Sequence, residues 1–170
     1  RGSAGCGKST WIEQNGLKPY ALSADDIRLL CQSPVLQPDG TVGISQSNDK
    51  TVWKTLFNLL EIRMQKGDFT VIDATNSKTS EMNRYKQMCE TYRYRMYCVD
   101  FTDIPIDEVK RRNASREELK RVPDEAIDKM YSRFKTQKIP SGIKVIKPDE
   151  LDSIWMKLFD LSEYKKIHHI

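Results

Sequence analysis

The chain has 170 residues, of which 38% are hydrophobic and 31% are charged, and its 28 Lys and Arg exceed its 24 Asp and Glu by a formal net charge of +4. This length fits one globular domain, and the composition excludes collagen-like, low-complexity and disordered classes. No apolar run approaches the ~20 residues of a membrane helix, and no signal peptide opens the sequence as written, so we expect no membrane partner.

In chain order, the sequence predicts helices that alternate with short strands. A glycine-rich turn over residues 2–7 enters a helix at Lys8, and a strand over 20–23 precedes a helix over 25–31. Residues 32–48 have no sustained periodicity and are predicted to form a long loop that orders over a substrate. The remaining predicted helices cover residues 49–67, 80–92, 105–113, 123–138 and 149–161, and the remaining strands cover 69–73, 95–101 and 143–146.

This alternation predicts an α/β fold, with a mostly parallel sheet flanked by helices on both faces. A glycine-rich phosphate loop needs a hydrophobic strand that leads into it, so we expect such a strand upstream of Arg1. Residues 1–163 are expected to form this domain, and residues 164–170 to begin a further domain or a linker. The helix over 49–67 is expected to begin at Asn48 or Asp49 and to end at Gly67.

The most specific motif is G-S-A-G-C-G-K-S over residues 2–9, which satisfies G-x-x-x-x-G-K-[ST] in full. Glycines let backbone N–H groups approach phosphate oxygens, and the following helix adds its positive N-terminal end. Lys8 is expected to reach the β and γ phosphates, and Ser9 to hold Mg²⁺ through its hydroxyl. The predicted nucleotide contacts in this loop are Gly2, Ser3, Ala4, Gly5, Cys6, Gly7, Lys8, Ser9 and Thr10. The alternative is an ordinary glycine turn at the start of a helix.

A phosphate loop alone leaves GTPase switches, ATPase motors and small kinases open. The chain has no N-K-x-D motif to read a base, and motors usually need a larger body, so a small kinase is favoured. Such an enzyme needs a carboxylate to take a proton from the acceptor hydroxyl. Asp25, at the carboxyl end of a predicted strand, fits this role, and Arg28 could grip an acceptor phosphate. The alternative is that Asp25 or Asp26 only caps the helix.

Two further segments offer kinase chemistry. Residues 110–121 hold six basic and two acidic side chains, and R-N-A-S-R over 112–116 lies where a helix ends. We expect a lid over about residues 113–122 that closes an arginine on the transferring phosphate, an effect worth about 10³ to 10⁵ in rate. A solvated charged face is the alternative. Asp73 follows a strand, where it could orient Mg²⁺-bound water, position Arg28 or simply end the strand in a turn.

The four cysteines form no C-x-x-C pair and have no histidine nearby. This argues against a zinc site and against a disulfide framework, and it favours a reducing, cytoplasmic location.

In order along the chain, G-x-x-G-x-G-K-S-T, S-A-D-D-I-R, V-I-D-A-T-N and R-N-A-S-R resemble the kinase module of bacterial and bacteriophage 5′-OH polynucleotide kinases, which heal RNA and DNA ends. The resemblance covers residues 2–138. It implies transfer of the γ phosphate of ATP, or another NTP, with Mg²⁺, to the 5′-OH end of RNA or DNA. It implies catalytic roles for Lys8, Asp25, Arg28 and Arg116, nucleotide contacts for Arg112 and Arg116, and substrate contacts for Arg28, Asp73, Thr75 and Asn76.

Residues 164–170 are similar to the strand that leads into a calcineurin-like metallophosphatase, which implies a covalently linked phosphatase domain beyond Ile170. Two other functions remain open from the residues: a P-loop kinase of a small metabolite or antibiotic, and a nucleotide-dependent binding switch. The sequence does not choose between RNA and DNA or between ATP and GTP, and it leaves the oligomeric state unknown.

Overall fold

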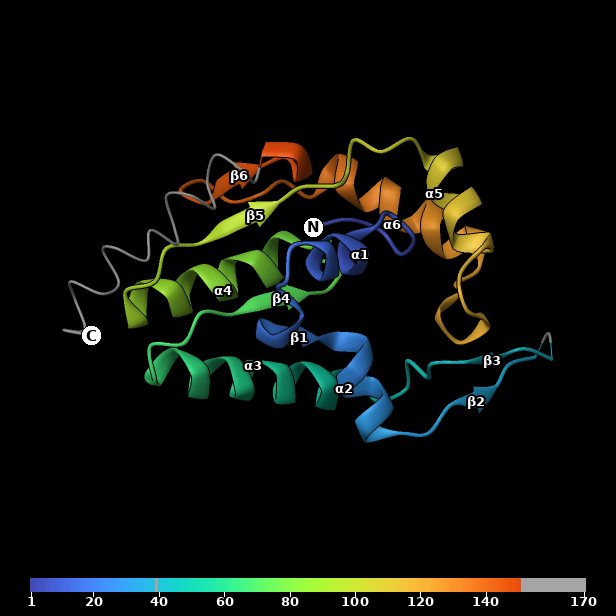
Figure 1. Cartoon of the computed structure of the whole chain (residues 1–170), viewed down its shortest axis with the longest axis horizontal. Coiled ribbons are helices and arrows are strands. Elements are labelled where there is room, and N and C mark those ends of the chain that lie inside the picture. The colour runs from blue at the N-terminus through green and yellow to red at the C-terminus, as the bar shows by residue number, and fades with distance from the viewer. Residues whose placement is uncertain (39, 151–170) are drawn as a thin grey trace.

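The computed structural model describes residues 1–38 and 40–150, and the predicted alternation of helices and strands is present in them (Figure 1). The helices are α1 (Lys8–Gln14), α2 (Ala24–Cys31), α3 (Asp49–Gln65), α4 (Thr79–Tyr92), α5 (Ile106–Ala114) and α6 (Asp124–Thr136). The strands are β1 (Ala21–Ser23), β2 (Val35–Leu36), β3 (Val42–Gly43), β4 (Val71–Asp73), β5 (Tyr97–Val99) and β6 (Lys144–Ile146). Single 3-10 turns occupy Lys18–Tyr20, Glu118–Lys120 and Pro148–Glu150. The rest of the predicted helix over 149–161, and the segment 164–170, lie outside the described residues.

The strands form two separate parallel pairs and one hairpin, and not the single sheet that we predicted. β1 pairs with β4, so that Ser23 lies opposite Asp73, and β5 pairs with β6. β2 and β3 form an antiparallel hairpin inside the segment that was predicted to be a loop. Figure 1 shows this hairpin extending away from the strand pairs, toward the turn that connects α5 and α6.

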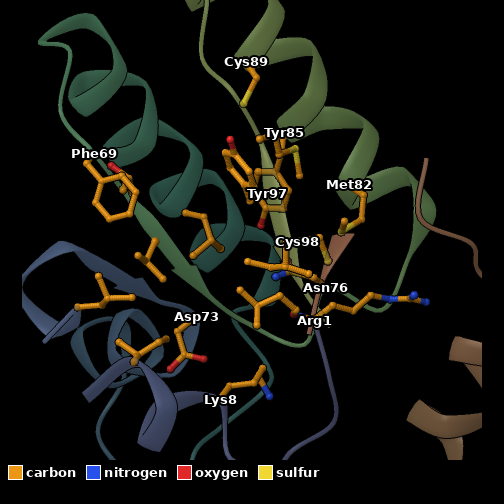
Figure 2. Close-up of a pocket in the computed structure, with 18 of the residues that line it drawn as sticks. Arg1, Lys8, Phe69, Asp73, Asn76, Met82, Tyr85, Cys89, Tyr97 and Cys98 are labelled. Atoms are coloured by element: carbon orange, nitrogen blue, oxygen red, sulfur yellow. The ribbon is translucent and has the colours of Figure 1, made fainter. Parts of the chain in front are cut away.

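A slot separates the two parallel pairs (Figure 2). It contains a cavity of about 230 Å³ between β4 and β5, with Lys8 and Asp73 at one end and Cys89 at the other. The first two residues close part of the slot, because the Arg1 amine donates to the Val99 carbonyl at 2.7 Å and the Gly2 N–H donates to the Thr75 carbonyl at 3.2 Å. The backbone of these residues therefore bonds to β5 and to the segment that directly follows β4, whereas β4 and β5 do not pair with each other.

Two of the three apolar clusters among the described residues position the elements around the phosphate loop. The first lies between α2, α3, α4 and the β1–β4 pair, and its members on α3 recur at helical spacing: Val52, Leu56, Phe57, Leu60 and Met64. The second joins the phosphate loop to α5 and α6 through Cys6, Phe101, Val109 and Ile127. Burying an aliphatic side chain of this size contributes about 1.5–3 kcal/mol, so the second cluster fastens the loop to α5.

The ends of α2 and α3 are set by different devices. The Ser23 hydroxyl caps α2 by accepting the Asp26 N–H at 3.2 Å, so the cap belongs to Ser23 and not to Asp25 or Asp26. Asn48 occupies the N-cap position of α3, as predicted, but its side-chain amide donates to Gln32 at 3.0 Å and makes no cap. Gly67 follows the end of α3 with φ +78, the left-handed conformation that favours glycine.

Among the described residues, no helix combines the length and the hydropathy that crossing a bilayer requires.

Candidate functional site

The glycine-rich loop is shaped by two left-handed glycines and by its contact with α5. Gly5 has φ +78 and Gly7 has φ +97, conformations that side chains with a Cβ rarely adopt. A Cβ on Gly5 would lie 2.9 Å from the Val109 carbonyl and 3.1 Å from the Asn113 Cβ. The loop therefore needs glycine at this position both for its turn and for its close approach to α5.

Lys8, the first residue of α1, folds its side chain back over the loop. Its ammonium donates to the carbonyls of Gly2 at 3.0 Å and Ser3 at 2.7 Å. These carbonyls are neutral, so the ammonium is attracted more strongly to the negatively charged oxygens of a phosphate. The Lys8 ammonium is thus held at the loop, where an incoming phosphate can compete for it.

Ser9 contacts Asp73 across the end of β4. The Ser9 hydroxyl donates to Asp73 Oδ2 at 2.7 Å. The structure therefore places Asp73 beside Ser9, the last residue of the phosphate-loop motif. A hydroxyl and a carboxylate are hard oxygen ligands of the kind that Mg²⁺ prefers. Mg²⁺ is usually bound by only one or two carboxylates, and waters and substrate phosphates complete its coordination shell. The pair fits such an ion, although no cluster of three or more His, Cys, Asp or Glu side chains occurs in residues 1–38 and 40–150.

Asp25 and Arg28 lie at the same end of the β1–β4 pair as Asp73. Asp25 Oδ1 accepts from Arg28 Nη1 at 2.8 Å, and the Asp25 side chain is 54% exposed. The Arg28 side chain is only 11% exposed. Asp49 Oδ1 accepts hydrogen bonds from the other edge of its guanidinium, from Nε at 3.1 Å and from Nη2 at 2.6 Å. Arg28 thus joins two carboxylates, one from its own helix and one from the first turn of α3.

Most cations of the basic segment, residues 110–121, have partners within the described part of the chain. Lys110 contacts Asp128 at 2.8 Å, and Lys120 contacts Glu117 at 3.3 Å. The guanidinium of Arg116, by contrast, makes neither an ion pair nor a hydrogen bond with any residue that the structure describes. Within the basic segment, Arg116 is therefore a cation available for an external anion.

Arg112 lies beside the phosphate loop, where Glu108 holds it. Its Nε donates to Glu108 Oε1 at 2.6 Å, and its Nη1 reaches the Cys6 carbonyl at 3.5 Å. Hydrogen bonds from Arg111 and then from Arg112 lower the pKa of Glu108 from its ordinary value of 4.5 to about 2. Glu108 therefore orients Arg112 toward the loop, and the predicted nucleotide contact of Arg112 has a position from which it can be made.

The hairpin and the basic segment meet, although they lie 76 residues apart in the sequence. The Val42 N–H on β3 donates to Glu118 Oε1 at 3.0 Å, within the 3-10 turn of Glu118–Lys120. Leu36 on β2 is 75% exposed. The hairpin and the basic segment therefore share a contact, made by residues that the sequence predicted to be part of a long loop.

Thr75 and Asn76 are placed differently from the other predicted substrate residues. The Thr75 carbonyl accepts the Gly2 N–H, so its main chain supports the phosphate loop. Asn76 is 7% exposed with φ +46, its amide donates to the Ala74 carbonyl at 3.3 Å, and it lines the slot (Figure 2). The Asn76 side chain is therefore buried beside the cavity, whereas the Asp25 side chain is half exposed, and the predicted contact of Asn76 with substrate stays a prediction.

Two residues of this site were missed by the sequence interpretation. Asp49 was predicted only as a candidate helix cap, and its pairing with Arg28 had no signal other than an acidic residue in the first turn of a helix. Glu108 had a local signal, because it lies three and four residues before Arg111 and Arg112 on one helix. That spacing predicts the contact with the two arginines, but not that the contact directs Arg112 to the loop.

Comparison with known proteins supports the nucleotide-binding part of this arrangement. A family model described as AAA domain, AAA_33, matches residues 1–137, which include the phosphate loop, Asp25, Asp73 and the basic segment. No curated protein matches the sequence. The family is P-loop and kinase-like, and such domains generally use a nucleoside triphosphate and Mg²⁺. The chain belongs to this AAA domain family, AAA_33, and has its P-loop, kinase-like character.

Proposed function

We propose that the chain transfers the γ phosphate of ATP, or another NTP, to the 5′-hydroxyl end of RNA or DNA. The observation that carries the proposal is the register of β1 against β4, with Ser23 opposite Asp73. Adjacent strands lie about 4.8 Å apart. Asp73, the last residue of β4, contacts Ser9 on the triphosphate side, and Asp25, on the acceptor side, lies two residues after the end of the neighbouring strand β1. A transfer reaction needs this proximity of donor and acceptor.

On the donor side, the loop N–H groups, Lys8 and Arg112 are suited to bind the triphosphate. The Lys8 ammonium exchanges its two loop carbonyls for phosphate oxygens. Ser9 and Asp73 would hold Mg²⁺, which when bound neutralises charge on the β and γ phosphates. Such a set of fixed positive groups stabilises the charge of the transferring phosphoryl group.

On the acceptor side, Asp25 takes the proton of the 5′-hydroxyl while the hydroxyl oxygen forms its bond to the γ phosphorus. The bond from that phosphorus to the β–γ bridging oxygen breaks, and the nucleoside diphosphate leaves. Ser23, and not Asp25, caps α2, which supports this role because the Asp25 carboxylate then contacts only Arg28 among the described residues, and solvent. A positioned base of this kind contributes about 10²- to 10⁴-fold in rate.

Arg116 completes the site as the arginine of a lid over residues 113–122. Its unengaged guanidinium supports this role, since the other cations of that segment already have partners. The contact between the basic segment and the β2–β3 hairpin supports a polymer as the acceptor, because it extends the acceptor side beyond the size of one small molecule. The order of the four motifs that resemble polynucleotide kinases supports the same acceptor.

The test is phosphate transfer from γ-labelled ATP with Mg²⁺ to a 5′-OH oligonucleotide. We expect Asp25→Asn and Arg116→Ala to remove the label from the oligonucleotide. Two matched controls should retain it: Asp26→Asn, whose side chain pairs with Lys18 at 3.5 Å, and Lys120→Ala, which lies in the same basic segment as Arg116. Competition between 5′-OH RNA and 5′-OH DNA then identifies the preferred acceptor.

Other products of the same assay would contradict the proposal. Label found only as inorganic phosphate would favour a nucleotide-dependent binding switch. Label on a small molecule from an added metabolite or antibiotic set, with none on the oligonucleotide, would favour a small-molecule kinase.

A further inference from the structure

Arg28 is held far more firmly than a helix ion pair alone would hold it. An exposed pair three residues apart on one helix, such as Asp25 with Arg28, stabilises a helix by only about 0.2–0.5 kcal/mol. Asp49 adds hydrogen bonds to Nε and Nη2 of the same guanidinium, from a helix that begins 21 residues later. Together the two carboxylates engage all three guanidinium nitrogens and leave the side chain 11% exposed.

The two carboxylates differ in what else they can do. Asp25 lies in the first turn of α2, with its side chain 54% exposed, and it is the base in the proposed reaction. Asp49 lies in the first turn of α3, and only Oδ1 contacts Arg28. Because α2 packs on α3 in the same apolar cluster, Asp49 is a fixed point relative to Arg28. The guanidinium is planar and rigid, so holding one edge fixes the direction of the other edge.

We propose that Asp49 is a positioning residue for phosphate transfer: it locks the guanidinium of Arg28, and Arg28 in turn holds the Asp25 carboxylate in the orientation that accepts the proton. This role rests on the proposed function. It also changes the role of Arg28, which becomes the link between two carboxylates in addition to its predicted contact with the acceptor end.

The first test measures how firmly Asp49 holds the Arg28 guanidinium, and it does not depend on activity. In protein labelled with ¹⁵N, the Nε–H signal of Arg28, identified by its loss in Arg28→Lys, should persist against solvent exchange in the wild type. We expect Asp49→Asn to weaken that protection at least tenfold and Asp26→Asn to leave it unchanged. Equal protection in Asp49→Asn and the wild type would overturn the proposal that Asp49 fixes the guanidinium of Arg28.

The second test measures catalysis. Displacing a reacting group by about 1 Å can cost 10²-fold, so we expect Asp49→Asn to lower kcat by about ten- to a hundredfold. The KM for ATP and for the 5′-OH oligonucleotide should stay within about twofold, because positioning of the base acts on the transition state. Asp49→Glu, which keeps a carboxylate, should recover part of kcat, and the melting temperature of each variant shows that it is folded.

Each result separates this role from the proposed function. A wild-type chain that labels no oligonucleotide overturns the proposed function, whatever the variants do. An active wild type with unchanged kcat in Asp49→Asn overturns the positioning role alone. A raised acceptor KM with unchanged kcat also overturns it, because Asp49 would then act on acceptor binding through Arg28.

Discussion

Replacing Gly5 with alanine tests how the phosphate loop is seated on α5. Two costs follow from the structure. The left-handed φ of +78 costs about 1–2 kcal/mol for a residue with a Cβ, and a Cβ at 2.9 Å from the Val109 carbonyl adds the 1–3 kcal/mol that is typical of overpacking. The lower entropy of unfolded alanine returns about 0.4–1 kcal/mol. We therefore expect Gly5→Ala to lower the free energy of unfolding by about 1–5 kcal/mol.

Gly16 provides the matched control for this substitution. It has φ +67, but a Cβ there would meet nothing within 4 Å, so Gly16→Ala has the conformational cost alone. The difference between the two variants isolates the packing of the loop against α5. At roughly 2–4 °C per kcal/mol for a chain of this size, thermal melts should place Gly5→Ala about 2–12 °C below Gly16→Ala. Equal melting temperatures would refute the close approach of the loop to α5.

Two further results are expected. Asp73→Asn should weaken ATP binding about tenfold in the presence of Mg²⁺, a loss of roughly 1.4 kcal/mol, and should leave ATP binding unchanged in EDTA. Calorimetry that finds the same loss of affinity in both conditions would contradict a role for Asp73 in holding the metal. The pKa of Glu108 in the folded chain lies below its ordinary value of 4.5. The pairing of Glu108 with Arg111 and Arg112 therefore stabilises the fold fully above pH 4.5, and this stabilisation is lost as the pH falls through about 2. An NMR titration of Glu108 with a midpoint near 4.5 would refute the pairing.

The parts of the fold that follow from local pattern were predicted from the sequence. The apolar spacing of Val52, Leu56 and Leu60 predicts α3, and a buried face of this kind stabilises a helix wherever it packs. The phosphate loop was predictable because the left-handed turns at Gly5 and Gly7 need glycine, which marks them in the sequence. The β2–β3 hairpin was missed because strands of two residues are too short to show an alternating pattern.

The parts of the site that depend on contacts between distant residues were not predictable in this way. The pairing of Arg28 with Asp49 depends on how α2 packs on α3, and the contact of Val42 with Glu118 joins residues 76 positions apart. The Ser9–Asp73 contact could be predicted in part, because Ser9 belongs to the phosphate-loop motif and Asp73 ends a strand, where ligands bind in open α/β sheets. The burial of Asn76 in the slot had no signal, since asparagine is common both in exposed turns and at left-handed positions.

The position of the transferred phosphate tests the central claim most directly. After incubation with γ-labelled ATP and Mg²⁺, a 5′-OH oligonucleotide digested to mononucleotides should yield its label as the 5′-monophosphate of its first nucleotide. An oligonucleotide whose 5′ end is already phosphorylated should take up none. Label that is absent from the first nucleotide, or that enters both oligonucleotides equally, would contradict transfer to the 5′-hydroxyl by Asp25 and Arg116.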